Sequence, residues 1–250
     1  MKTTNPALSS KILEQLGRTG QLQAGEAMTV EGAINKTALL TFLVIVPAAW
    51  IWSEVVRAQS LETVVPWMVG GVIGGLIAAM VTIFKKEWAP VTAPIYAVLE
   101  GLAIGGVSAM LNMQYHGIVI QAVALTFATL ACMLIAYRTG LIKVTDRFRM
   151  MVVAATGAIA LLYLVTMLLS FFHVTVPFVF GTGGTGGIVL SLVIVGVAAL
   201  NLALDFDFIE QAAGIGAPKY VEWYAAFGLM VTLIWLYMEI LRLLGQLRRR

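Results

Sequence analysis

The stretch VPWMVGGVIGGLIAAMVTIF, Val65–Phe84, holds twenty consecutive residues without one ionisable side chain. An α-helix of about 20 apolar residues spans the hydrocarbon core of a bilayer, which is about 30 Å thick. The rest of the chain has the same character, because 60% of its 250 residues are hydrophobic, 12% are charged and the mean hydropathy is +0.92. The sequence therefore predicts an integral membrane protein and excludes an ordinary soluble domain.

Six further apolar stretches lie before and after this one, and together they predict an all-α polytopic protein with seven transmembrane helices. The predicted spans are 37–56, 65–84, 90–111, 118–137, 150–171, 187–206 and 220–244. Residues 1–35 are polar and lack the apolar region of a secretory signal peptide. We therefore expect a short cytoplasmic N-terminal arm, 1–35, followed by one transmembrane domain, 36–250.

Lysine and arginine predict the orientation of the chain in the membrane. They gather on the side of the N-terminus, whereas the loops after the third and fifth spans contain none. By the positive-inside rule, the N-terminus is cytoplasmic. Seven crossings place Arg248, Arg249 and Arg250 on the opposite side, against this rule, so a last segment that enters the membrane and returns is the alternative. The net charge of +3 fits membrane orientation and gives no reason to expect a nucleic-acid partner.

Ionisable side chains inside the predicted spans are the main candidates for function, because each costs about 2.5 to 3.5 kcal/mol at membrane depth. Glu100 lies near the middle of the third span. Asp205 lies near the inner end of the sixth, in ALNLALDFDFIEQ (Ala199–Gln211), with Asn201 one turn before it. Glu239 lies in the last span, one turn from Arg242, and an intrahelical pair between these two is the simpler interpretation of both.

Three further carboxylates, Asp207, Glu210 and Glu222, follow where the chain passes from the sixth span to the seventh. For these the simpler interpretation is a solvated connection.

Helix rise places Asp205 about 12 Å, and Glu100 about 15 Å, from the cytoplasmic ends of their helices. Two carboxylates that face each other in a dry interior cannot both ionise cheaply, so the pair would share a proton and titrate as a unit. Their oxygens would also suit Ca²⁺, which takes carboxylate, carbonyl and water ligands. The sequence predicts a cation site among Asp205, Asp207, Glu100 and Asn201, with Asp205 and Glu100 as the metal ligands.

An enzyme is not expected, and neither is a cofactor. An intramembrane enzyme needs a nucleophile and a base at matched depth, or a metal cluster. The histidines, His116 and His173, fall in predicted outer loops without a second ligand at helical spacing. The single cysteine, Cys132, excludes an intramolecular disulfide and a CxxC zinc site.

Four segments share a resemblance to a known family. They are MTVEGAINKTALL (Met28–Leu40), PIYAVLEGLAIGGVS (Pro94–Ser108), LDFDFIEQ (Leu204–Gln211) and APKYVEWYAAFGLMVTLIWLYMEILRLL (Ala217–Leu244). These segments resemble the Bax inhibitor-1 family, and more narrowly its bacterial YccA-like branch. The resemblance implies a bacterial inner membrane protein in which six helices surround a central last one. It also implies a pH-sensitive Ca²⁺ leak channel, in which one carboxylate in the sixth helix and one in the seventh act as proton sensor and gate.

Matched by motif, the two gating positions fall on Asp205 and on Glu239, where this chain has the longer carboxylate. An unbroken last helix starting at Lys219 would raise Glu239 about 30 Å above its cytoplasmic end, far from Asp205. The second span also holds no arginine that could brace the pair. Either the last helix bends around Gly228, or the working partner of Asp205 is Glu100, which the sequence slightly favours.

The leading hypothesis is a passive, proton-gated cation pathway whose partners are the lipid bilayer, protons and Ca²⁺. The alternative is a non-conducting membrane regulator that binds a membrane protease or another membrane partner, as the YccA-like resemblance suggests. In that case exposed residues of the arm, such as Lys11, Glu14 and Arg18, matter more than the buried acids.

Overall fold

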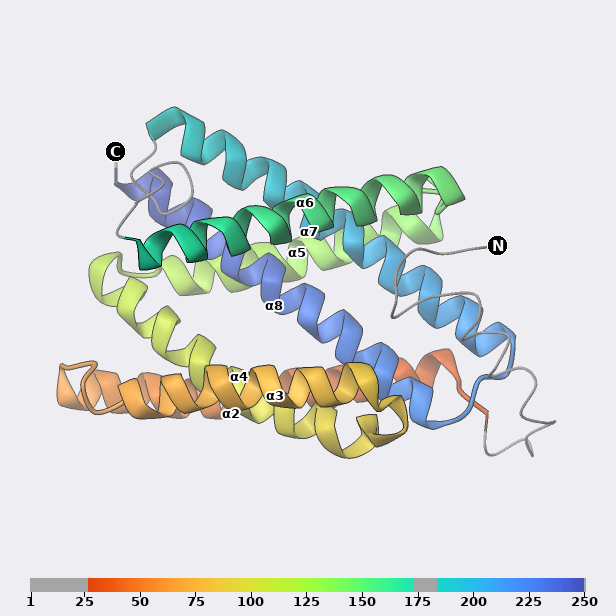
Figure 1. Ribbon diagram of the computed structural model, residues 1–250, viewed down its shortest axis with the longest axis horizontal. Helices are drawn as coiled ribbons and strands as arrows, with labels where there is room; N and C mark the ends of the chain where they lie inside the picture. Colours follow the sequence, from red (N-terminus) through yellow and green to blue (C-terminus); the bar gives the residue numbers. More distant parts are fainter. Residues whose placement is uncertain (1–26, 173–183, 250) are drawn as a thin grey trace. The chain divides into compact units, whose positions relative to one another are not determined.

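The computed structural model describes residues 27–172 and 184–249 (Figure 1). Within them, apart from one isolated bridge between Ala27 and Pro218, the regular structure is helical. The helices are α2 (Val30–Ala58), α3 (Val65–Phe84), the short 3₁₀ helix η1 (Lys86–Trp88), α4 (Ala89–Gln114), α5 (Ile118–Arg138), α6 (Asp146–Phe171), α7 (Gly184–Gly214) and α8 (Tyr220–Arg248). The seven α-helices are long and apolar enough to cross a membrane, which confirms the predicted all-α, seven-helix fold class.

The first span begins earlier than the predicted 37–56, because the helix α2 starts at Val30, inside the predicted arm. The Thr29 side chain caps it by accepting a hydrogen bond of 2.9 Å from the backbone N–H of Gly32, and Glu31 lies in the first turn. Both features stabilise the start of a helix. The remainder of the arm, residues 1–26, lies outside the described residues.

The last helix, α8, is a single helix that passes through Gly228 without a break (Figure 1). Its 29 residues correspond to about 43 Å, which is more than the thickness of a hydrocarbon core. The sequence offered a bend around Gly228 as one way to bring Glu239 to Asp205, and α8 stays helical through that residue.

The end of α8 is held by arginine side chains. Arg248 Nη1 donates to the backbone oxygen of His116 at 2.7 Å, and its Nη2 donates to Gln121 Oε1 at 2.9 Å. Arg249 Nε donates to the Tyr115 hydroxyl at 3.3 Å. The last turn of α8 therefore lies beside the turn that joins α4 to α5.

The helices group into two units. The first unit comprises α2, α3, η1, α4, the end of α7 and the start of α8, the last two within Asp207–Val231. The second comprises α5, α6, the remainder of α7 and the end of α8, within Tyr115–Phe206 and Thr232–Arg250.

In the first unit, α4 packs against both α2 and α3. Glycines allow the backbones to approach closely. A Cβ atom on Gly71 would lie 2.5 Å from the backbone oxygen of Leu99, and one on Gly105 would lie 2.7 Å from the backbone of Ala48. Small residues at such contacts are typical of helices that associate in lipid.

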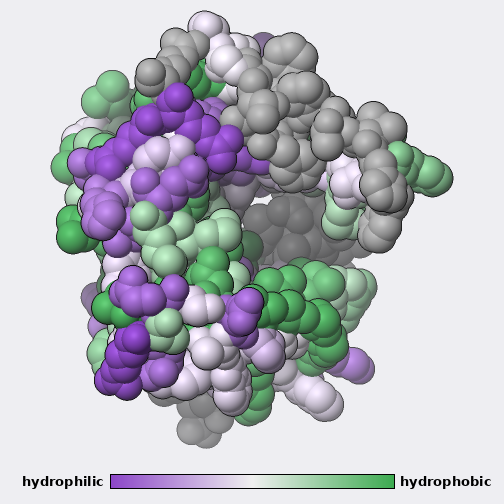
Figure 2. All heavy atoms as spheres, turned by 90° about the vertical axis from the view of Figure 1, so that its left-hand side faces the viewer, coloured by the Kyte–Doolittle hydropathy of each residue, from purple (hydrophilic) through white to green (hydrophobic). Residues whose placement is uncertain are grey.

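Many large apolar side chains are exposed on the outside of the helices. Phe42, Leu76 and Ile120 keep 60%, 64% and 76% of their surface accessible. Figure 2 shows hydrophobic side chains reaching the surface next to hydrophilic ones on the face that it views. A soluble protein rarely exposes so many large apolar residues, so these surfaces fit contact with lipid.

Candidate functional site

Asp205 lies on α7 and places one carboxyl oxygen in an enclosed position. The Thr232 hydroxyl of α8 donates a hydrogen bond to this carboxyl group, and both residues belong to the second unit. Although Asp205 as a whole is half-buried, its Oδ2 is buried and has no hydrogen-bond partner among the described residues. A buried carboxylate oxygen without a donor is costly, so such an atom indicates a place for a proton, a cation or a water molecule.

Glu239 lies on the same helix as Thr232 and is only 5% exposed. The Tyr163 hydroxyl of α6 donates a hydrogen bond to its Oε1, and Arg242 Nη1 lies 3.5 Å from its Oε2. Arg242 also donates to the Tyr163 hydroxyl at 2.7 Å. The predicted intrahelical pair between Glu239 and Arg242 is thus present, but Tyr163 was missed, because a lone tyrosine in an apolar span gives no sequence signal.

The contacts of Asp205 and Glu239 lie at different levels of α8. Thr232 and Glu239 are seven residues apart, so they share one face of the helix and are separated by about 10 Å along its axis. Asp205 is bonded at the level of Thr232, two turns from Glu239. The two carboxyl groups therefore have separate partners.

The other predicted cation ligands are divided between the two units. Asn201, in the second unit, donates from Nδ2 to Thr156 Oγ1 of α6 at 2.8 Å and to the backbone oxygen of Val197 at 2.9 Å. Asp207, in the first unit, accepts a 2.6 Å hydrogen bond from Gln211 one turn later. Only Asp205 and Asn201 of the predicted set belong to the second unit.

Glu100 lies on α4 in the first unit and is half-buried. Its carboxyl group rests against α3, because a Cβ atom on Gly75 would lie 3.1 Å from Glu100 Oε2. Tyr96, one turn earlier, lies near enough to interact with its charge. A pair between Glu100 and Asp205 stays a prediction, since the two residues belong to different units.

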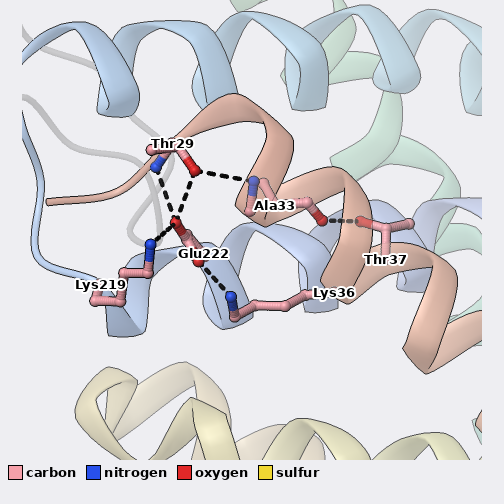
Figure 3. A network of polar contacts seen from close by, with 7 residues as sticks. Thr29, Ala33, Lys36, Thr37, Lys219 and Glu222 are labelled. Atoms are coloured by element: carbon pink, nitrogen blue, oxygen red, sulfur yellow. Dashed lines mark hydrogen bonds and ion pairs between the residues drawn. The ribbon is translucent and has the colours of Figure 1, made fainter. Parts of the chain in front are cut away.

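Glu222 is the most heavily bonded carboxylate that the structure describes, and its interpretation as a solvated loop residue is wrong. Its exposure is 0%. Its Oε1 accepts from Thr29 N at 2.9 Å, from Thr29 Oγ1 at 3.1 Å and from Lys219 Nζ at 3.0 Å, while Lys36 pairs with its Oε2 (Figure 3). This Glu222 cluster of four residues joins the start of α2 to the start of α8 in the first unit.

No group of three or more His, Cys, Asp and Glu residues that could hold a metal ion occurs within 27–172 and 184–249. Cys132 is exposed on α5, the backbone oxygen of His116 is bonded to Arg248, and His173 lies outside the described residues. The predicted ligand pair of Asp205 and Glu100 is smaller than such a cluster, and it remains a prediction.

Replacing Tyr163 by Phe is expected to lower the free energy of unfolding by about 1 to 3 kcal/mol, because buried Glu239 loses a donor and Arg242 loses an acceptor. Reversible unfolding in detergent micelles measures the change. In a Glu239→Leu background the same substitution should lower the free energy of unfolding by clearly less, since the phenol then has no carboxylate to bind. Equal costs in both backgrounds would show that Tyr163 does not act through Glu239.

Comparison with known families gives one result. A family model described as Bax inhibitor 1 like matches residues 5–249. Comparisons with curated proteins and with solved structures found no match. The matched range includes all seven long helices and the contacts of Asp205, Glu239 and Glu222.

Proposed function

The chain belongs to the Bax inhibitor 1-like family, and from this premise we propose that it is a pH-sensitive passive cation leak channel, with Ca²⁺ as the ion. We place it in the bacterial inner membrane with its N-terminus in the cytoplasm. The seven apolar helices support a multi-pass membrane protein. The observation on which the proposal rests is the enclosed Oδ2 of Asp205, at a point where α7 meets α8.

Proton sensing follows from the cost of an ionised carboxylate at this position. An isolated charge at membrane depth is expensive, so Asp205 is stable there only with a proton, a cation or a strong donor. Its one bonded donor among the described residues is the neutral hydroxyl of Thr232. Gain or loss of one proton therefore changes the balance of forces between the two helices.

Gating then needs two arrangements of α7 and α8 that differ in their affinity for a proton at Asp205. Ionised Asp205 accepts the hydrogen bond from Thr232 and holds the helices together. Protonated Asp205 accepts it more weakly, so acidification shifts the population toward the open arrangement. The same carboxylate is a hard oxygen ligand, so Ca²⁺ and protons compete for it.

The proposal is tested by Ca²⁺ flux into liposomes that contain the purified protein. We expect a leak that increases between pH 8 and pH 6 and, in Asp205→Asn, a leak that no longer responds to pH, because an amide cannot take up the proton. Glu54→Gln is the control, since Glu54 pairs with Arg57 on α2 and is not among the predicted cation ligands. It should keep the response of the unmodified protein.

Two outcomes would contradict the proposal. Protein that passes no Ca²⁺ at any pH would favour the non-conducting regulator that binds a membrane protease or another membrane partner. A pH response that survives in Asp205→Asn would keep the leak but move the sensor to another carboxylate, with Glu239 and Glu100 tested next by the same substitution to Gln.

A further inference from the structure

Polar contacts in the second unit recur along α8 at a fixed interval. Thr232 bonds Asp205, Glu239 bonds Tyr163, and Gln246 Oε1 accepts a 3.1 Å hydrogen bond from Ser191 Oγ. The three α8 positions are seven residues apart, so they lie on one face of the helix. They form a line of polar contacts between Asp205 and Gln246, which we call the polar seam.

The register of α7 against α8 is constant along this seam. Fourteen residues separate Ser191 from Asp205 on α7, and fourteen separate Thr232 from Gln246 on α8, in the opposite direction. The two helices are therefore antiparallel neighbours over about 21 Å. In this register the residue level with Glu239 is Ala198, which is completely buried and has a small side chain.

With this register, a polar group occurs at nearly every turn of the seam. Asn201, bonded to Thr156 of α6, lies one turn from Asp205, and the next turn holds Glu239 with Tyr163. Arg242 follows one turn later, and Gln246 ends the series. Successive groups are thus about 5 Å apart along the axis, a gap that one water molecule spans with two hydrogen bonds of about 2.8 Å.

The two ends of the seam hold unpaired polar atoms. Among the described residues, the buried side-chain nitrogen and oxygen atoms without a hydrogen-bond partner are Asp205 Oδ2 and Gln246 Nε2. Leaving such atoms unpaired costs about 1 to 3 kcal/mol each. The usual partner of a polar atom in this position is a bound water molecule. Asp205 Oδ2 is a hydrogen-bond acceptor and Gln246 Nε2 is a donor, and the two atoms lie at opposite ends of the polar seam.

We propose that the polar seam holds a single file of water molecules that carries protons between Asp205 and the end of α8. A proton enters at a water bonded to Gln246, each water passes one proton to the next, and the Asp205 carboxylate receives the last one. Only O–H bonds form and break, and no electron is transferred. The inference rests on the proposed function because it gives the sensor its access to solvent.

The seam suits protons better than Ca²⁺. A calcium ion takes six to eight oxygen ligands, whereas one polar group per turn offers far fewer at any level. The charged and titratable groups along the path are Glu239 and Arg242 of α8 and Tyr163 of α6, and they bond to one another. Tyr137 of α5 lies with its ring against Phe206, the residue after Asp205. Because Arg242 is paired with Glu239, its charge does not bar the path.

The direction of access follows from the helix ends. Gln246 lies two residues before Arg248, which is bonded to the turn between α4 and α5. The file of water therefore opens at that end of the second unit. Asp205 accordingly responds to the pH on the side of the membrane where α8 ends, which is the side opposite the N-terminus for seven crossings.

Thiol accessibility tests the seam without any need for ion flux. In a Cys132→Ser background, Ala198→Cys places a thiol beside Glu239, and Ala203→Cys is the matched control. Both alanines are completely buried on α7, but they are five positions apart, so the second lies on another face of the helix. The hydrogen of a thiol exchanges for deuterium in D₂O only where water reaches the sulfur, so loss of the S–H infrared band reports a water molecule beside the thiol. In the full-length protein in liposomes we expect this exchange to be about tenfold faster or more for Ala198→Cys than for Ala203→Cys.

Two further variants complete the test. Ser191→Cys, near the open end, should also exchange rapidly, and it replaces Ala198→Cys if that variant does not fold. Gln246→Leu should slow the exchange at position 198, because it removes the polar group at the entrance. Equal rates for Ala198→Cys and Ala203→Cys, or no effect of Gln246→Leu, would overturn the proposal.

The two proposals fail in distinguishable ways. Rapid exchange at position 198 in a protein that passes no Ca²⁺ would retain the water file and remove the channel. A pH-dependent leak with no difference in exchange between positions 198 and 203 would retain the channel and remove the water file.

Discussion

Glu222→Ala is expected to lower the free energy of unfolding by about 3 kcal/mol, at the lower end of the range for breaking a buried ion pair. The Glu222 carboxylate is completely buried and bonds Thr29, Lys36 and Lys219. Its removal leaves the Lys36 ammonium, only 18% exposed, without its counterion. Lys219, half exposed, can turn to solvent, which limits the loss. Reversible unfolding in detergent micelles, followed by circular dichroism, measures the change in the free energy of unfolding.

Two further variants test whether this loss of stability comes from the Glu222 cluster. Gly32→Ala keeps all four residues of the Glu222 cluster but places a Cβ atom on the Glu222 carboxyl group, so it should also destabilise the protein. Glu62→Ala is the control, because Glu62 is an exposed glutamate between α2 and α3 and should change stability by less than about 0.5 kcal/mol. An equal effect of Glu222→Ala and Glu62→Ala would show that the cluster contributes nothing to stability.

Gly71→Val is expected to destabilise the first unit by about 2 to 3 kcal/mol, because a side chain there must displace the α4 backbone. A Cβ atom on Gly71 would lie 2.5 Å from the backbone oxygen of Leu99 and 3.1 Å from the nitrogen of Ala103. The neighbouring Gly70 offers a matched control in the same turn of α3, because a Cβ atom there meets nothing within 4 Å. Gly70→Val should therefore be nearly neutral.

The comparison between these two glycines is read from unfolding in micelles and from the amount of folded protein in the membrane. Valine at either position has the same helix propensity, so the difference between the variants reports packing alone. If both substitutions had the same effect, the close approach of α3 and α4 would not contribute to stability.

The helices could be predicted from the sequence because a run of about twenty apolar residues is typical of a membrane-spanning helix and of few other structures. The predicted span Val65–Phe84 begins and ends at the same residues as α3. The start of α2 could not be predicted in the same way, because Val30 to Lys36 includes polar residues that hydropathy assigns to water. What stabilises those turns is the Thr29 cap and the pairing of Lys36 with Glu222, a residue 186 positions away.

The sequence singled out Asp205 and Glu239 as candidates, but it did not predict the partners that the structure gives them. Asp205 and Glu239 stood out because charge is rare in the spans, and the separation of their contacts follows from the rise of an unbroken helix. Thr232 and Tyr163 did not stand out, since neutral hydroxyl groups are common in membrane helices. The seven-residue spacing of Thr232, Glu239 and Gln246 is visible in the sequence. Its meaning depends on the register of α7, which only the structure supplies.

The bonds of Arg248 and Arg249 affect how the topology of such chains is deduced. Rules that count arginines treat each one as a free charge that resists export, and by that count the C-terminus of this chain would be assigned to the cytoplasm. Here both guanidinium groups are bonded to the turn between α4 and α5, which the same rule assigns to the outside for lack of lysine and arginine. Arginines already engaged by the protein should be given less weight than free ones in orienting a membrane protein, and two adjacent residues are enough to reverse the deduced location of a chain end.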